Sequence, residues 1–128
     1  MARGCLAHLA DQDVDMLVVE LGDGLMGNYG VRDLLGAADL KAHIDALALC
    51  ANDPVGAFGG SVILEGLGLK ASVITGPATD NTAGTGAMST LGIPAINAVQ
   101  QSNEFGHTLL ARLGLASTPP MSLARSSA

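Results

Sequence analysis

The apolar run over residues 16–21, Met-Leu-Val-Val-Glu-Leu, is the feature that most constrains how this chain can fold. It is nearly continuously apolar and β-branched at its centre, which is typical of a strand covered on both faces. Strands of this kind belong to parallel sheets, because the crossover helices lie on the faces of the sheet. We therefore expect an α/β fold built on a parallel sheet.

Signals for helices and further strands alternate after this run. Apolar residues at helical spacing predict a helix from a cap at Asp39 to Ala51. Asp53 followed by Pro54 predicts the start of a second helix. We expect this helix to bury one side and to end at Gly66 or Gly68; the residues of that side are Val55, Phe58, Val62 and Leu67.

The remaining signals complete a small three-layer parallel sheet in the order β-α-α-β-α-β-α. The expected elements are a helical turn or two over residues 6–10, strands over 69–75 and 94–99, and helices over 82–91 and 103–113, the last capped by Ser102. Three strands make a thin sheet, since about five are usual. The chain is then either the C-terminal half of a doubly wound domain completed by another chain, or a small α/β protein that completes its sheet by dimerising.

Length and charge set further limits on the chain. Its 128 residues allow one domain, expected over residues 1–115, with a Pro- and Ser-rich tail over 116–128 that is flexible or lies on a partner. Twelve acidic and six basic residues give a net charge of -6, which disfavours binding to nucleic acids and anionic membranes. No signal peptide and no spanning segment of about 20 apolar residues is recognised, so we expect a soluble, cytoplasmic protein. Cys5 and Cys50 are expected as buried, reduced thiols.

A glycine-rich turn follows the first expected strand. Gly22, Gly24 and Gly27 have the spacing of a dinucleotide fingerprint, which keeps an NAD(P)-linked oxidoreductase component as one alternative. Residues 28–30 prolong the loop where that fingerprint would open a helix, and Asp23 places a negative charge among the glycines. The other alternative is a tight surface connection whose glycines only permit positive φ.

Acidic residues at the end of the same strand favour a different chemistry. Glu20 and Asp23 are expected at the carboxyl edge of the sheet, where α/β folds bind their ligands. Hard oxygen ligands suit Mg²⁺ and a phosphate-bearing substrate, so these two are candidate metal ligands and catalytic residues. Gly22, Gly24 and Asn28 are candidate ligand-binding residues of the turn.

Residues 18–24, an apolar strand followed by an acid and Gly-Asp-Gly, resemble the Walker B segment of P-loop NTPases related to dethiobiotin synthetase and the MinD group. By element order the resemblance extends over residues 14–113. It implies that Glu20 or Asp23 helps to hold Mg²⁺ beside a nucleotide or positions the reacting group. The P-loop itself is missing, because neither Lys41 nor Lys70 follows the required glycine loop. The resemblance therefore implies that another chain supplies the P-loop, or that the fold serves another purpose.

A second polar loop leaves the strand over 69–75. If the strands are parallel, this loop reaches the same edge as Glu20, and both loops face one crevice. The candidate ligand-binding residues here are Thr79, Asp80, Asn81 and Thr82. The resemblance places base-reading polar residues in this region, although helix capping alone also explains Asp80 or Asn81. Asn97, inside an apolar strand, is expected to contact a ligand or to brace a neighbouring loop.

These patterns predict a small α/β subunit that contributes acidic and polar loops to a nucleotide- or phosphate-linked small-molecule site, with Mg²⁺ and a nucleotide as candidate cofactors. The expected partners are further copies of the chain or another protein chain that completes the site. The alternative is a non-catalytic structural or regulatory subunit, because glycine- and alanine-rich helices allow close packing against another chain. No Ser-His-Asp or Cys-His arrangement can be assembled from the spacing, so catalysis by this chain stays open.

Overall fold

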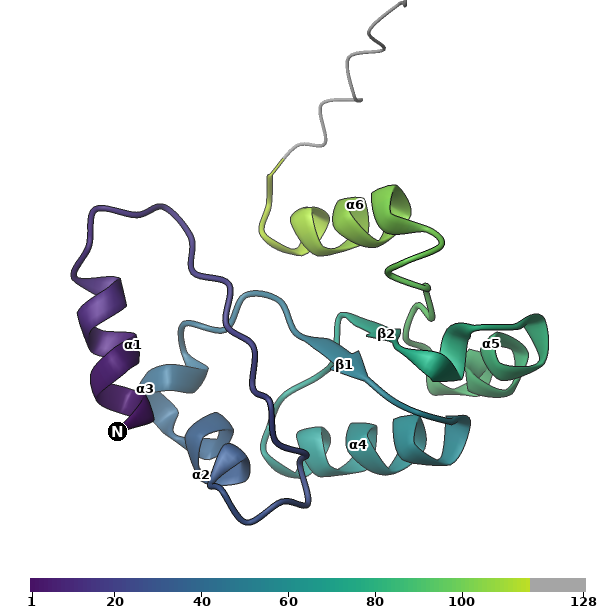
Figure 1. Cartoon of the computed structure of the whole chain (residues 1–128), viewed down its shortest axis with the longest axis horizontal. Coiled ribbons are helices and arrows are strands. Elements are labelled where there is room, and N and C mark those ends of the chain that lie inside the picture. Colours follow the sequence, from purple (N-terminus) through teal and green to yellow (C-terminus); the bar gives the residue numbers. More distant parts are fainter. Residues whose placement is uncertain (116–128) are drawn as a thin grey trace, which may run out of the picture. The chain divides into compact units, whose positions relative to one another are not determined.

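The computed structural model describes residues 1–115, which divide into two compact units (Figure 1). The first unit covers residues 1–43 and the second begins at Ile44. We describe each unit by itself. The expectation of one domain over residues 1–115 stays a prediction, and the expected tail over 116–128 lies outside the described residues.

The first unit consists of short helices and a long loop. Its helices are α1 (Ala2–Ala10), α2 (Val31–Gly36) and α3 (Ala38–Lys41). The helical turn expected over residues 6–10 is confirmed by α1. Asp39 is not a helix cap as expected, because α3 begins one residue earlier and its N-cap is Ala37. The Asp39 carboxylate instead accepts a hydrogen bond from Arg3, and this contact holds the pKa of Asp39 below its ordinary value.

Residues 16–21 do not form the expected strand. They lie in the loop between α1 and α2, and the side chains of Met16, Leu17, Val18 and Val19 are exposed, with Val18 at 88%. A run of this kind becomes a strand only when a neighbouring strand pairs with its backbone. No strand within residues 1–115 pairs with it. The prediction of a strand over 16–21 is therefore wrong, because a strand depends on a pairing partner and none lies within the described residues.

The second unit contains a small parallel sheet. β1 (Ala48–Cys50) pairs in parallel with β2 (Val73–Thr75), with Leu49 opposite Ile74. The strand expected over 94–99 is reduced to a parallel bridge between Ile74 and Ala95. The mixed α/β character and the parallel direction are thus confirmed, whereas the expected sheet of three strands is replaced by a two-stranded sheet with one added bridge.

β1 lies where the sequence predicts a helix reaching Ala51. Alanine and leucine favour helices, but helix propensity is a weak preference that tertiary contacts override. Leu49 is buried and the segment pairs with β2, so the gain from burial and ladder hydrogen bonds outweighs the local preference. Apolar residues keep a helical spacing beyond Lys41, where α3 ends, so the predicted helix was too long.

α4 (Pro54–Gly66) begins where Asp53 and Pro54 predict. The Asp53 carboxylate caps it by accepting a hydrogen bond from the Gly56 amide at 2.7 Å. The buried face is not the expected one. Ala57, Ser61 and Leu64 are buried, whereas Val55, Phe58 and Val62 are 80%, 58% and 51% exposed. Apolar residues occur on both sides of this helix, so their spacing alone does not select the buried side.

The remaining helices follow the sequence closely. The prediction over 82–91 is confirmed by α5 (Thr82–Met88) and the 3₁₀ turn η2 (Ser89–Leu91), and that over 103–113 by α6 (Ser102–Arg112). Ser102 is the first residue of α6 and not its cap, which is Gln101. In Figure 1, α4 and α6 lie on opposite sides of the two-stranded sheet. The largest fully buried side chains are Leu64, Val73, Ile74 and Met88.

Candidate functional site

A pocket of about 380 Å³ opens at the carboxyl ends of β1 and β2, and we call it the edge pocket. Loops after parallel strands meet at this edge, which is why open α/β sheets bind ligands there. The residues that line the edge pocket are Cys50, Thr75, Gly76, Pro77, Asp80, Asn97, Ala98, Val99 and Gln100. Asp80 and Asn97 were both predicted as site residues, and the fold brings them together here.

Asn97 fixes the polar side of the edge pocket. Its side chain is 4% exposed, and its Nδ2 donates a hydrogen bond to Asp80 Oδ1 at 2.9 Å. Its Oδ1 accepts hydrogen bonds from the backbone amides of Val99 and Gln100 at 3.0 and 2.9 Å. The nitrogen and the oxygen of the buried side-chain amide therefore both have hydrogen-bond partners. Of the two roles expected for Asn97, the bracing of a neighbouring loop is observed.

Asp80 is the charged group of the edge pocket. One carboxylate oxygen accepts from Asn97, and within residues 1–115 the other oxygen, Oδ2, has no hydrogen-bond partner. The residue itself is exposed. A carboxylate held in this way accepts hydrogen bonds from N–H or O–H groups of a ligand.

The strand end behind the pocket is held by close backbone contacts. The buried Thr75 hydroxyl accepts a hydrogen bond from the Ala98 amide at 2.9 Å, which ties the end of β2 to the segment that carries Asn97. Gly76 has φ of 90°, and a Cβ at this position would lie 2.7 Å from the Ala51 carbonyl oxygen. Only glycine fits this position without displacing the backbone after β1.

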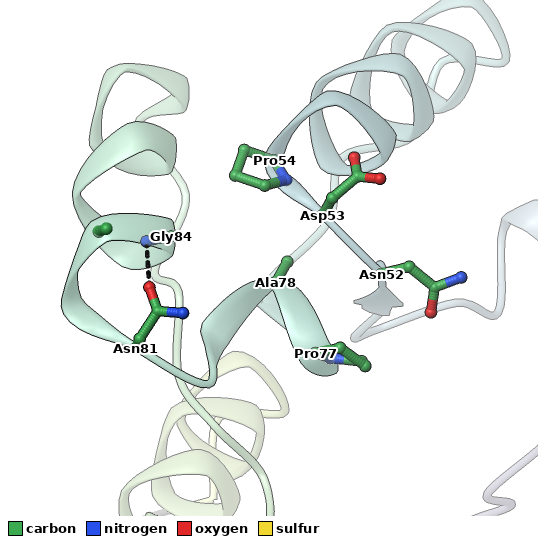
Figure 2. Close-up of a pocket in the computed structure, with 8 residues that line it drawn as sticks. Asn52, Asp53, Pro54, Pro77, Ala78, Asn81 and Gly84 are labelled. Atoms are coloured by element: carbon green, nitrogen blue, oxygen red, sulfur yellow. Dashed lines mark hydrogen bonds between the residues drawn. The ribbon is translucent and has the colours of Figure 1, made fainter.

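A second pocket, which we call the cap pocket, lies beside the first and encloses about 390 Å³. It is lined by Asn52, Asp53, Pro54, Pro77, Ala78, Asn81, Ala83 and Gly84 (Figure 2). Asn81 caps α5 by accepting a hydrogen bond from the Gly84 amide at 2.9 Å, just as Asp53 caps α4. Helix capping thus explains both polar side chains at the helix starts.

Pro77, the first residue of the 3₁₀ turn η1 (Pro77–Thr79), lines both pockets. Thr79 lies within this turn, where its hydroxyl donates to the Gly76 carbonyl at 2.7 Å. Thr82, the first residue of α5, is exposed and lines neither pocket. The Thr79 hydroxyl is thus bonded within its own turn, and Thr82 begins α5. The predicted role of both residues in ligand binding stays a prediction.

The candidate residues of the glycine turn belong to the first unit. The Asp23 carboxylate accepts a hydrogen bond from the Tyr29 amide at 3.2 Å, which closes a turn that contains Gly24 and Asn28, and Gly22 lies directly before it. No strand precedes this turn in the described chain, and α2 starts only at Val31. The turn thus lacks the strand and the immediate helix that a dinucleotide fingerprint requires.

Sequence reasoning missed two features of the site. Cys50 was expected to be buried, but Cys50 and Cys5 are both exposed, free thiols, and Cys50 lines the edge pocket. The prediction of buried thiols was wrong because it rested on the average behaviour of cysteine and not on a pattern in this sequence. Gly76 was also missed, since its need for glycine comes from Ala51, which is distant in sequence.

Among the described residues, no group of three or more His, Cys, Asp or Glu side chains is arranged to hold a metal ion. In the same part of the chain, no helix has the length and apolar character needed to cross a membrane. Comparison with known proteins found no match to a family model, a curated protein or a solved structure.

Proposed function

We propose that the second unit binds the base or ribose end of a nucleotide in the edge pocket, as one part of a site that another chain completes. The observation that carries this proposal is the Asp80 carboxylate, held by the buried Asn97 at the carboxyl edge of a parallel sheet. Its free oxygen suits the N–H groups of a nucleobase or the hydroxyls of a ribose. The resemblance to P-loop NTPases favours a nucleotide over other ligands that carry such groups.

The charges around the pocket argue for this orientation of the ligand. Neither pocket is lined by lysine or arginine, and Asp80 would repel a phosphate placed beside it. The phosphates would therefore point away from Asp80, toward cations that come from elsewhere. The chain's net charge of -6 likewise favours phosphate-binding groups on a different chain.

Mg²⁺ has a place in this proposal only together with the phosphates. The ion is usually held by one or two carboxylates and by the phosphate oxygens of the substrate, so a three-carboxylate cluster is not needed. Glu20 and Asp23 remain the proposed carboxylates for this ion. When bound, Mg²⁺ would offset phosphate charge.

Protection of the Cys50 thiol from alkylation tests this proposal. Cys50 lines the edge pocket and Cys5, also exposed, belongs to the first unit, so one reaction contains both the reporter and its reference. We expect ATP, GTP or the corresponding nucleoside to slow the alkylation of Cys50 and not of Cys5. Inorganic phosphate alone should protect neither thiol.

A matched pair of variants makes the test specific. Asp80→Asn removes the charge and weakens acceptance of hydrogen bonds, so we expect roughly a 10-fold loss of nucleotide affinity, or about 1.4 kcal/mol. Asp45→Asn removes an exposed carboxylate of the same unit that lines neither pocket and should leave affinity unchanged. Equal affinity of both variants would contradict the proposal, and so would a lack of protection by every nucleoside and nucleotide tested.

One observation favours the alternative of a non-catalytic subunit. Val55, Phe58 and Val62 form an exposed apolar stripe on α4, which is the kind of surface that mediates contact between proteins. If no nucleotide protects Cys50, a subunit that acts only by packing becomes the better proposal. The NAD(P)-linked alternative has no comparable support, because the glycine turn lacks its flanking strand and helix.

A further inference from the structure

The Thr75 hydroxyl is a second polar group of the edge pocket, besides the Asp80 carboxylate. Thr75 ends β2, lines the pocket and is 4% exposed. Its hydroxyl oxygen accepts a hydrogen bond from the Ala98 amide at 2.9 Å, and no residue within 1–115 accepts one from this hydroxyl in return. The Thr79 hydroxyl, by contrast, donates to the Gly76 carbonyl. Because a hydroxyl can accept and donate at once, Thr75 keeps a donor for a group inside the pocket.

Thr75 and Asp80 are both tied to one short segment of the chain. Asp80 Oδ1 accepts a hydrogen bond from the Asn97 side chain, and the Thr75 hydroxyl accepts one from the amide of the next residue, Ala98. Consecutive Cα atoms are about 3.8 Å apart, so this segment keeps the two groups near each other. The edge pocket thus contains an acceptor, Asp80 Oδ2, and a donor, the Thr75 hydroxyl, as a pair.

The walls around this pair include several apolar side chains. Pro77, Ala98 and Val99 line the pocket with hydrocarbon side chains, and neither lysine nor arginine lines it. Ligand sites commonly combine apolar walls with a few polar groups that fix the orientation of the ligand. A nucleobase has the same division, because its two faces stack and its edge forms hydrogen bonds. A ribose carries hydroxyls that apolar walls would leave unpaired, so this lining favours the base over the ribose.

We propose that the Asp80 carboxylate and the Thr75 hydroxyl together recognise the hydrogen-bonding edge of a nucleobase, and that the ribose lies outside this contact. The inference rests on the nucleotide binding proposed above and adds Thr75 to the same site. Asp80 accepts from an N–H group of the base, and Thr75 donates to the acceptor beside it. Adenine is the base that tests this best, because its amino group has a ring nitrogen on each side.

Nucleosides that lack one group at a time test the contact with Asp80. They carry no phosphate, so the full chain can be tested without a second chain that supplies phosphate-binding groups. Purine riboside lacks the amino group of adenosine, and we expect it to need a roughly 10-fold higher concentration to slow the alkylation of Cys50 equally. 2′-Deoxyadenosine and 3′-deoxyadenosine keep the base and should match adenosine. The alkylation of Cys5 is again the reference.

The variant Asp80→Asn shows whether Asp80 makes this contact. An amide oxygen is a weaker acceptor than a carboxylate, so adenosine should bind less tightly while purine riboside changes little. We expect the preference for adenosine to fall from roughly 10-fold to about 2-fold. A structural effect alone would weaken both nucleosides equally and leave the preference unchanged. Asp45→Asn is the control and should keep the full preference.

A second pair of variants tests Thr75. Thr75→Ser keeps the hydroxyl, and Thr75→Val replaces it with a methyl group. The matched ligands are 1-deazaadenosine and 7-deazaadenosine, each of which lacks one ring nitrogen beside the amino group. The wild-type chain and Thr75→Ser should bind one of these analogues several-fold less tightly than adenosine, whereas Thr75→Val should bind all three equally. Circular dichroism checks that both variants fold, since Thr75→Val also removes the acceptor of the Ala98 amide.

The outcomes separate the base contact from nucleotide binding itself. Equal protection by adenosine and purine riboside would overturn the contact with Asp80, and weaker protection by the deoxynucleosides would then place the ribose there. Equal binding of adenosine and both deaza analogues to the wild-type chain would overturn the role of Thr75, even if Thr75→Val fails to fold. Protection by other nucleosides but not by adenosine would also count against the pair. In all these cases the proposed function stands, and it fails only if no nucleoside or nucleotide protects Cys50.

Discussion

Asn97 is the residue on which the polar geometry of the edge pocket depends. Its side chain joins Asp80 to the backbone of residues 99 and 100 through three hydrogen bonds. Asn97→Ala would remove these three hydrogen bonds, and a typical intramolecular hydrogen bond contributes about 0.5–1.5 kcal/mol to stability. We expect the free energy of unfolding to fall by about 2 kcal/mol in urea denaturation. Asn52→Ala, at an exposed position, should change it by less than about 0.5 kcal/mol; equal effects would contradict the bracing role.

Gly76 is the second residue whose identity is set by its surroundings. Gly76→Ala would combine a positive φ with a Cβ 2.7 Å from Ala51 O, and strain of this kind costs about 1–3 kcal/mol. Gly86→Ala is the matched control, because Gly86 lies in α5 with no atom near its Cβ position. We expect a lower melting temperature for the first variant and an equal or higher one for the second. The opposite order would show that the approach to Ala51 does not constrain the loop.

The pair formed by Arg3 and Asp39 gives a pH-dependent prediction. Its hydrogen bond holds the pKa of Asp39 below the ordinary value of 3.8. A carboxyl with a depressed folded pKa contributes stability above its unfolded pKa, and this contribution is lost as the pH falls through the folded pKa. Because both side chains are exposed, we expect little change in stability. Carboxyl NMR should show Asp39 titrating below 3.8, and Arg3→Ala should return it to about that value; identical titrations would refute the contact.

Among the elements, α4 shows that the spacing of apolar residues does not by itself predict which side of a helix is buried. Leu64 is 1% exposed and Phe58 is 58% exposed, although both are large apolar residues of one helix. We expect Leu64→Ala to lower the free energy of unfolding by about 2–5 kcal/mol, since it leaves a cavity. Phe58→Ala should cost less than about 1 kcal/mol in the same urea titration. A larger loss for Phe58→Ala would mean that its face of α4 is covered in solution.

Elements with local signals could be predicted from the sequence, and those that need a distant partner could not. Asp53 begins α4 and Asn81 caps α5 through amides three residues away, so the cause of each helix start is contained in a few neighbouring residues. A strand depends on a second strand. β1 was missed because its pairing with β2 is invisible in its own composition, and residues 16–21 were assigned to a strand that has no partner within the described residues.

In the candidate site, too, local features could be predicted from the sequence and contacts between distant residues could not. The sequence placed polar residues after the strand over 69–75 and recognised that a buried Asn97 needs hydrogen-bond partners. The sequence could not show that Asp80 is one of these partners, because the hydrogen bond joins residues 17 positions apart. The backbone approach of Gly76 to Ala51 was hidden for the same reason.

At the scale of the whole molecule, the two units differ in how much apolar surface they bury. Val31 and Leu35 are the buried apolar residues of the first unit within the described chain, and the others all belong to the second. We therefore expect residues 44–128 alone to unfold cooperatively and residues 1–43 alone to show no cooperative transition. Calorimetry of the two fragments checks this, and a non-cooperative melt of residues 44–128 would contradict it.

The parallel pairing of β1 with β2 also determines the order in which the second unit can assemble. Parallel strands cannot be joined by a tight turn, so the segment between Cys50 and Val73, which includes α4, must close before the first ladder hydrogen bond forms. The loss of chain entropy comes before the gain from pairing, which makes such contacts slow to form. α4 has its own cap and forms from local contacts, so it shortens this search by holding the two strand segments near each other. During that interval the apolar residues around Leu49 are open to other chains, and the rate of loop closure sets how long newly made protein is at risk of aggregation.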